Sequence, residues 1–188
     1  MGKRTLKPAA EFTPSPVVLV TCGTGQKANI IAISWAGVVC SDPPMVGVAV
    51  RPSRHSHSLM METPEFAVNF PTEAHLRSAD LCGNISGRAG DKFAAAGFTP
   101  LAGEKISVPI IAECPLALEC KTVQVIHLGS HDLFLGEVLA VRADEEIVKE
   151  RGGIDYWRIA GIAAAGGNYW AADRAIAPLG FSANKEMS

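Results

Sequence analysis

The sequence has no apolar run long enough to cross a membrane. Its longest runs, such as residues 17–20 and 30–33, fall far short of the roughly 20 residues that a membrane helix needs. The basic N-terminus is interrupted by Pro8 and Glu11, where a signal peptide would need an unbroken apolar stretch. We therefore expect a soluble protein that is not secreted and has no membrane partner.

The chain also lacks an excess of either charge. It has 17 Lys and Arg residues against 19 Asp and Glu residues, which gives no global electrostatic case for a nucleic-acid partner. Its composition, with 48% hydrophobic and 19% charged residues, is that of an ordinary globular protein. A chain of 188 residues buries roughly 70% of its unfolded surface and needs neither disulfides nor a metal. One domain over residues 1–188 is the default expectation.

Paired cysteines are absent as well. The five cysteines are odd in number, and no two have the spacing of a zinc or dithiol motif. We interpret them as reduced, mostly buried thiols that pack as small hydrophobic side chains. Reduced thiols are typical of a cytoplasmic protein. These cysteines are Cys22, Cys40, Cys82, Cys114 and Cys120.

Short strands dominate the predicted secondary structure. Residues 15–22 and 29–40 are rich in β-branched side chains and flank a turn, which predicts a hairpin. Further strands are predicted at residues 45–51, 65–70, 116–128 and 133–142, the last two around a turn at Gly129-Ser130. Because short connections link most of these strands, an antiparallel Greek-key barrel is favoured over a parallel sheet.

A few helices are predicted between the strands. They cover residues 54–62, residues 72–81 with Thr72 as the cap, and residues 91–96 with Gly97 at the end. The C-terminal stretch is rich in glycine and alanine, which predicts loops around one weak element and a frayed tail from Ala183. The fold class is therefore mainly β with a few helices.

One glycine-rich segment resembles a dinucleotide-binding loop in its spacing. Gly23-Thr-Gly25-Gln-Lys-Ala28 follows an apolar strand, as the Rossmann motif requires. That loop must open a helix, however, and the residues after Ala28 are the strand formers Ile30, Ile31 and Ile33. We therefore favour a hairpin turn over a Rossmann loop.

The densest polar segment is Arg51-Pro-Ser53-Arg54-His-Ser56, at a predicted junction of strand and helix. Hydroxyl groups, exposed amides, the positive helix end and two guanidinium groups there suit a phosphate. A flavin mononucleotide needs such a phosphate site, polar contacts to the ring edge and a flat apolar slot. The alternative is that Ser53 only caps the helix and that the arginines are solvated.

Each of the other candidate residues also has an alternative role that requires no ligand. Asn29 and Ser34 lie on opposite faces of one predicted strand. The hydroxyl group of Ser34 could simply form a hydrogen bond with the backbone, and Trp35 could be an aromatic residue of the core. Lys92 could place a cation beside a flavin phosphate or ring edge, or pair with a carboxylate at the surface. His131, at a hairpin tip, could contact a ligand, cap or pack.

Taken in order, these segments resemble the flavoredoxin and flavin reductase family of FMN-binding split barrels over residues 15–142. The matching segments are residues 29–35, 42–44, 51–56, 65–69, 82–83, 86–87, 91–93 with Gly97, and 131–138. The resemblance implies a six-stranded antiparallel split barrel and a homodimer with one FMN per subunit near the interface.

The resemblance also implies roles for ten residues. Asn29, Ser34 and Trp35 would lie along the flavin, Arg51, Ser53, Arg54 and Ser56 near the phosphate, Ser86 and Lys92 on the ring or phosphate side, and His131 near the ring. Ser56 stands where relatives often carry threonine, and it keeps the hydroxyl group.

The implied function is an FMN-dependent oxidoreductase. It would take hydride from NADH or NADPH and pass electrons to a small-molecule or protein acceptor, without a side chain that acts as an acid. One alternative is an FMN-containing electron-transfer protein that a protein partner reduces, without NAD(P)H turnover. Another is a small-ligand barrel without redox activity.

Overall fold

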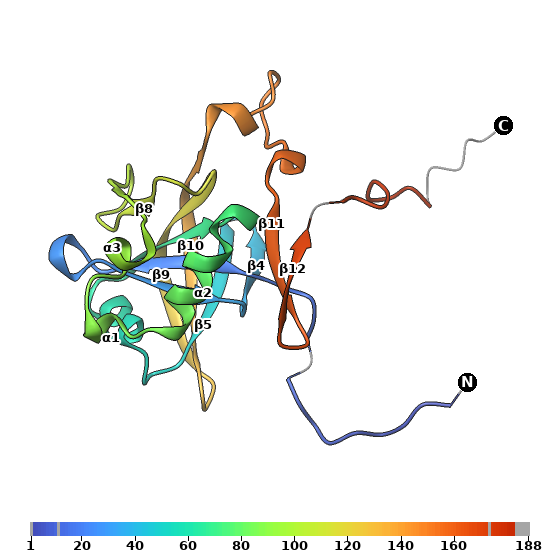
Figure 1. Cartoon of the computed structure of the whole chain (residues 1–188), viewed down its shortest axis with the longest axis horizontal. Helices are drawn as coiled ribbons and strands as arrows, with labels where there is room; N and C mark the ends of the chain where they lie inside the picture. Colours follow the sequence, from blue (N-terminus) through green and yellow to red (C-terminus); the bar gives the residue numbers. More distant parts are fainter. Residues whose placement is uncertain (1, 11, 173, 183–188) are drawn as a thin grey trace.

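The computed structural model describes residues 2–10, 12–172 and 174–182, and its main feature is a curled antiparallel sheet (Figure 1). Every strand pair in this sheet is antiparallel, which confirms the predicted mainly β fold with a few helices. In spatial order the sheet contains β3 (Asn29–Ile33), β2 (Val18–Cys22), β6 (Glu65–Phe70), β9 (Leu116–His127), β10 (Asp132–Ala143), β5 (Pro44–Val50) and β4 (Ala36–Ser41).

This main sheet has seven strands, where the resemblance implies six. The difference arises because the predicted strand at residues 29–40 divides into β3 and β4 at Ser34 and Trp35. These two strands form opposite edges of the sheet, and only two residues join them. The sheet must therefore curl until the end of β3 comes close to the start of β4, and Ser34 and Trp35 lie at this junction.

The segment with Rossmann-like spacing is a hairpin turn between β2 and β3, as predicted. It contains a short 3-10 helix at Gly25–Lys27 and leads into a strand, without the helix that a dinucleotide-binding loop opens. Gly23 has φ of 71°, and a Cβ atom there would lie 2.6 Å from the carbonyl oxygen of Lys27. Glycine is therefore required for the tight turn.

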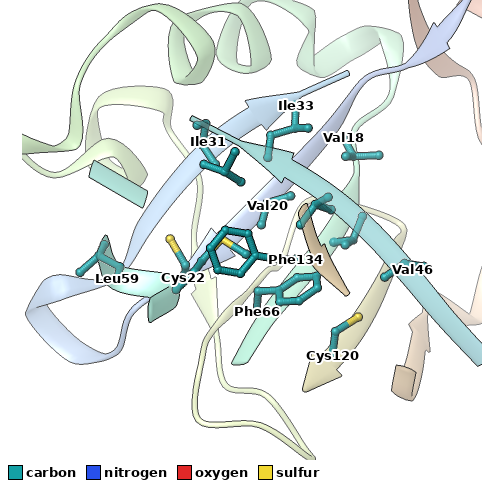
Figure 2. Packing of buried hydrophobic residues seen from close by; sticks show 14 residues of the cluster. Val18, Val20, Cys22, Ile31, Ile33, Val46, Leu59, Phe66, Cys120 and Phe134 are labelled. Carbon is teal, nitrogen blue, oxygen red and sulfur yellow. The ribbon is translucent and has the colours of Figure 1, made fainter. Parts of the chain in front are cut away.

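Two apolar layers hold the sheet together. Inside the curl, alternate side chains of the strands pack with Phe66 and Phe134, both fully buried (Figure 2). The opposite face of β2 and β3 contributes Leu19 and Ile30 to a second layer beneath the helices. The five cysteines are free, and all but the half-buried Cys40 are buried within these layers, as predicted.

The three predicted helices are present and gather on one side of the barrel (Figure 1). They are α1 (His55–Glu62), α2 (Leu76–Asn84) and α3 (Lys92–Ala96). Thr72 caps a 3-10 turn at Glu73–His75 that leads into α2. Asp91 caps α3 by accepting a hydrogen bond from the Phe93 amide at 2.8 Å, and Gly97 ends it with φ of 70°. None of the described helices is long and apolar enough to span a bilayer.

The C-terminal part contains two strands, so the prediction of one weak element was wrong. β11 (Gly161–Ala165) and β12 (Asn168–Ala172) form a hairpin that pairs with β1 (Ser15–Pro16). Gly166 and Gly167 both have positive φ, 57° and 77°, and form the tight two-residue turn that such hairpins use. The tail predicted to fray from Ala183 lies outside the described residues. A small pair, β7 (Pro100–Leu101) and β8 (Ile110–Ile111), completes the strands of the described ranges.

Candidate functional site

A cavity of about 400 Å³ opens between the end of β3, the loop before α1 and the loop between α2 and α3. Four cationic side chains line it, and no Asp or Glu is among the described residues that do. We call it the cationic cavity. Its cations are Arg51, Arg54, Arg88 and Lys92, and the other predicted residues that line it are Asn29, Ser53, Ser56 and Ser86.

A second cavity, of about 210 Å³, adjoins the cationic cavity. We call it the ring cavity. The two share Ile31, Arg51, Arg54 and Gly83 as lining residues, so they form one continuous groove. Ser34, Trp35 and His131 line the ring cavity. The structure thus brings all ten predicted site residues to this groove, and their contact with FMN stays a prediction.

Lys92 is buried beneath the cationic cavity, with only 4% of its surface exposed. Its Nζ donates hydrogen bonds to the carbonyl oxygens of Ile30 at 2.9 Å and Cys82 at 2.8 Å. Within the described residues it forms no ion pair, so the surface alternative is wrong. Burial lowers the pKa of this ammonium group, and the nearby Arg54 charge lowers the pKa further. An anion in the cavity would offset that penalty.

The loop before α1 is tied to β3 by a buried hydrogen bond. Asn29 Nδ2 donates to Ser56 Oγ at 2.8 Å, and both residues are almost fully buried. Arg54, rather than Ser53, is the N-cap residue of α1, so the helix-cap alternative for Ser53 is not found. The carbonyl oxygen of Ser53 instead accepts a hydrogen bond from Arg88 at 3.2 Å. Arg88 is a cation that the sequence interpretation missed, although it directly follows the matched Ser86-Gly87 pair.

Gly87 lies so close to Asn29 and His55 that a side chain at this position would force its neighbours to shift. A Cβ atom at Gly87 would collide with Oδ1 of Asn29 and would lie 2.8 Å from Cδ2 of His55. The backbone between α2 and α3 can therefore approach β3 and α1 only because this position lacks a side chain. This close approach forms one wall of the cationic cavity.

Trp35 and His131 form an aromatic pair at the ring cavity. Their ring centroids are 4.5 Å apart with an interplanar angle of 42°. Trp35 is 47% exposed, which excludes the alternative of a core aromatic. Partial burial, followed by the positive charge of Arg51, lowers the pKa of His131 and favours its neutral form. The hydroxyl of Ser34 makes no hydrogen bond in the described structure, so the backbone-bonded alternative is not found either.

Asp132, which directly follows His131, forms a cluster with two histidines that the sequence interpretation missed. The buried carboxylate of Asp132 contacts His57 Nε2 at 2.7 Å and His127 Nδ1 at 2.9 Å, each through a different oxygen. Hydrogen bonds from these two histidines lower the pKa of Asp132. The cluster joins α1 to the ends of β9 and β10. No local pattern signals it, since His57 and Asp132 are 75 positions apart.

A third cavity, of about 390 Å³, continues the groove past the ring cavity. We call it the acidic cavity because Asp80 is the one charged residue among the described residues that line it. Tyr169 of β12 donates a hydrogen bond from its hydroxyl group to Asp80 Oδ1 on α2 at 2.7 Å. Burial and this contact raise the pKa of Tyr169 to about 12, so the hydroxyl keeps its proton. The C-terminal hairpin thus forms a wall of the groove.

Comparisons with known proteins agree with this architecture. The chain is 33% identical to flavoredoxin of Desulfovibrio vulgaris (Miyazaki F), with a TM-score of 0.89 over 98% of this chain and 100% of that one. A putative flavin reductase with a split barrel domain from Shewanella frigidimarina is 23% identical, with a TM-score of 0.78 over 87% of this chain and 85% of that one, and shares the fold.

A curated relative gives further support. The NADH:riboflavin 5'-phosphate oxidoreductase of Streptomyces pristinaespiralis is 29% identical over 147 residues, which are 77% of this chain and 80% of the relative. The family described as "Flavin reductase like domain" matches residues 10–159. The chain therefore belongs to the flavin reductase-like family.

Proposed function

We propose that this protein binds FMN in the groove and uses it to move electrons from NADH or NADPH to an acceptor. The observation that carries this proposal is the buried Lys92 ammonium group beneath a cavity whose described lining includes three arginines and no carboxylate. Desolvating a charge is costly unless an opposite charge compensates it, so the cavity calls for an anionic ligand.

The polar and apolar parts of the groove suit different parts of FMN. The phosphate suits the cationic cavity, where the guanidinium groups of Arg51 and Arg54, the hydroxyl groups of Ser53 and Ser56, and the start of α1 meet. The ring suits the ring cavity, between the apolar side chains of β3 and the pair of Trp35 and His131. A relative named for NADH and riboflavin 5'-phosphate supports FMN as the ligand.

When bound, FMN supplies the chemistry of hydride acceptance and electron transfer. The side chains contribute binding, orientation and charge. Lys92 and the arginines favour negative charge in the groove, and the neutral His131 limits repulsion next to Arg51. No side chain is required as a proton donor in this proposal, and the electron acceptor is a small molecule or a protein.

We further propose a cytoplasmic homodimer with one FMN per subunit. Val38 and Val39 of β4 are largely exposed, and Val38 lines the same apolar cavity as the exposed Tyr156. This cavity has a volume of about 610 Å³. Apolar surface of this extent is typical of a protein interface. Analytical ultracentrifugation tests this part of the proposal, and a monomer at micromolar concentration would contradict it.

The first test is the visible absorption spectrum of the purified protein before and after anaerobic addition of NADH. A flavin spectrum that bleaches supports the oxidoreductase. A colourless protein that binds no added FMN would overturn the proposal and leave a ligand-binding barrel without redox activity.

The second candidate is an FMN-containing electron-transfer protein that a protein partner reduces. The similarity to flavoredoxin over almost the whole chain supports this second candidate. In the same experiment, repeated with NADPH, this candidate predicts a flavin spectrum that neither NADH nor NADPH bleaches. Tight FMN retention during gel filtration would agree with it.

A further inference from the structure

The groove has opposite charge at its two ends. At one end, four cationic side chains line the cationic cavity, and its lining has no carboxylate within the described part of the chain. At the other end, the acidic cavity contains Asp80 and no cation among its described lining residues. The ring cavity lies between them and shares Ala32, Ile33, Ser34 and Gly83 with the acidic cavity. A ligand in the acidic cavity therefore lies next to the proposed ring site and meets negative charge.

Asp80 is held in place but keeps binding capacity. Its Oδ1 accepts hydrogen bonds from Tyr169 at 2.7 Å and from Asn84 at 3.0 Å. In the described part of the chain, its Oδ2 accepts no hydrogen bond and the residue forms no ion pair. The amides of Asn84 and Asn168 also line the cavity and offer both donors and acceptors. The site thus suits a ligand with a carboxamide and a positive charge.

We propose that the acidic cavity binds the nicotinamide ring of the electron donor, with Asp80 as the residue that favours its oxidised, cationic form. This inference rests on the proposed function and adds the place and the charge selectivity of the second substrate. Asp80 acts on the substrate by charge, while Tyr169 and Asn84 position its carboxylate.

The charges at the two ends of the groove match the charges that the reaction would produce. When bound, FMN would accept the hydride that C4 of dihydronicotinamide gives up with its electron pair. The nicotinamide ring would then carry the positive charge of a pyridinium, and the flavin would carry the added negative charge. The carboxylate of Asp80 lies on the side where positive charge appears, and the cations lie on the other side. Such prearranged charges stabilise charge that develops during a reaction.

The test compares equilibrium binding of NAD⁺ and NADH to the FMN-loaded protein and its Asp80→Asn variant, under anaerobic conditions for NADH. Asparagine retains an oxygen that can accept the hydrogen bonds from Tyr169 and Asn84, so the fold should persist. Because Asp80 is exposed, we expect about a fivefold loss of NAD⁺ affinity and a smaller loss for NADH. FMN affinity should stay unchanged, which also reports correct folding.

Glu73→Gln is the matched control, because it removes an exposed carboxylate just before α2 that does not line the groove. It should bind NAD⁺ like the wild-type protein. Equal NAD⁺ affinity in the wild type and Asp80→Asn would overturn the inference while leaving the proposed function intact. If the wild-type protein binds FMN but neither NAD⁺, NADH, NADP⁺ nor NADPH, both the inference and the proposed use of NAD(P)H fail.

Discussion

His57 Nε2 lies 2.7 Å from Oδ2 of the buried Asp132, and this contact joins α1 to the start of β10. The two elements carry different parts of the groove. α1 follows the loop that contains Arg51 and Arg54, and β10 follows His131 directly. The contact therefore fixes the proposed phosphate end relative to the ring end.

Asp132→Asn should weaken FMN binding although Asp132 does not line the groove. The substitution removes the charge that holds the two histidines, so the hairpin tip with His131 should lose its fixed position relative to α1. We expect a lower melting temperature and severalfold weaker FMN binding, measured by fluorescence titration. His127→Gln is the control, since this exposed histidine does not contact α1, and its effect should be smaller. An unchanged FMN affinity in Asp132→Asn would refute the proposal that Asp132 holds the hairpin tip with His131 in position relative to α1.

The contribution of Asp132 to stability should persist at mildly acidic pH. Its pKa is lowered in the folded state, so its contribution is fully present above the ordinary carboxyl pKa of about 3.9 and disappears as the pH falls through the lower folded value. Urea unfolding of the wild type and Asp132→Asn at several pH values measures this. The difference in unfolding free energy should remain between pH 7 and pH 5 and shrink only below about pH 4.

Lys92→Met should weaken FMN binding strongly. Methionine has a similar length but no charge, so the bound phosphate or ring edge loses a charge-assisted contact worth about 1.5–3 kcal/mol. This corresponds to a dissociation constant roughly 10- to 100-fold higher, measured by titrating the apoprotein with FMN. Lys149→Met, at an exposed position away from the groove, should bind FMN normally. Equal affinity in both variants would place the flavin elsewhere.

FMN affinity should also fall at alkaline pH. Burial lowers the pKa of Lys92 below the ordinary value of about 10.4, so the apoprotein loses this charge earlier than an exposed lysine does. A bound anion favours the protonated form and raises that pKa, so binding takes up protons as the pH approaches the lowered value. Calorimetry in buffers of different ionisation enthalpy detects this uptake. The proton uptake that we assign to the Lys92 ammonium group should vanish in Lys92→Met. Proton uptake that persists in this variant would belong to another group.

Gly87→Ala should disturb the cationic cavity. The added methyl group would collide with Asn29 and crowd His55, so the loop between α2 and α3 must move away. Overpacking of this kind costs roughly 1–3 kcal/mol and should lower both the unfolding free energy and FMN affinity. Gly37→Ala is a control because Gly37 has open space around it and no positive φ. A Gly87→Ala protein as stable as Gly37→Ala would contradict this close packing of the loop.

The sequence by itself determined the elements whose signals are local. Period-two patterns predicted the strands, and Asp91 and Gly97 marked the ends of α3 because caps act on neighbouring residues. The phosphate loop at residues 51–56 was evident from its density of hydroxyl and guanidinium groups. The resemblance to a family added Ser86 and gave roles to the other candidates, including Lys92 and His131. The hairpin at Gly166 and Gly167 was missed, although its turn signal was present in the sequence.

Only the tertiary structure decided which residues meet. Lys92 has the pattern of a surface lysine in the sequence, yet packing of α3 against β3 buries its ammonium group beneath the cationic cavity. Asp80 and Tyr169 are 89 positions apart, and no local pattern connects them. The physical reason is that propensities and caps depend on the nearest neighbours in the chain. Burial, ion pairs and the charge of a cavity depend on segments that the curled sheet brings together.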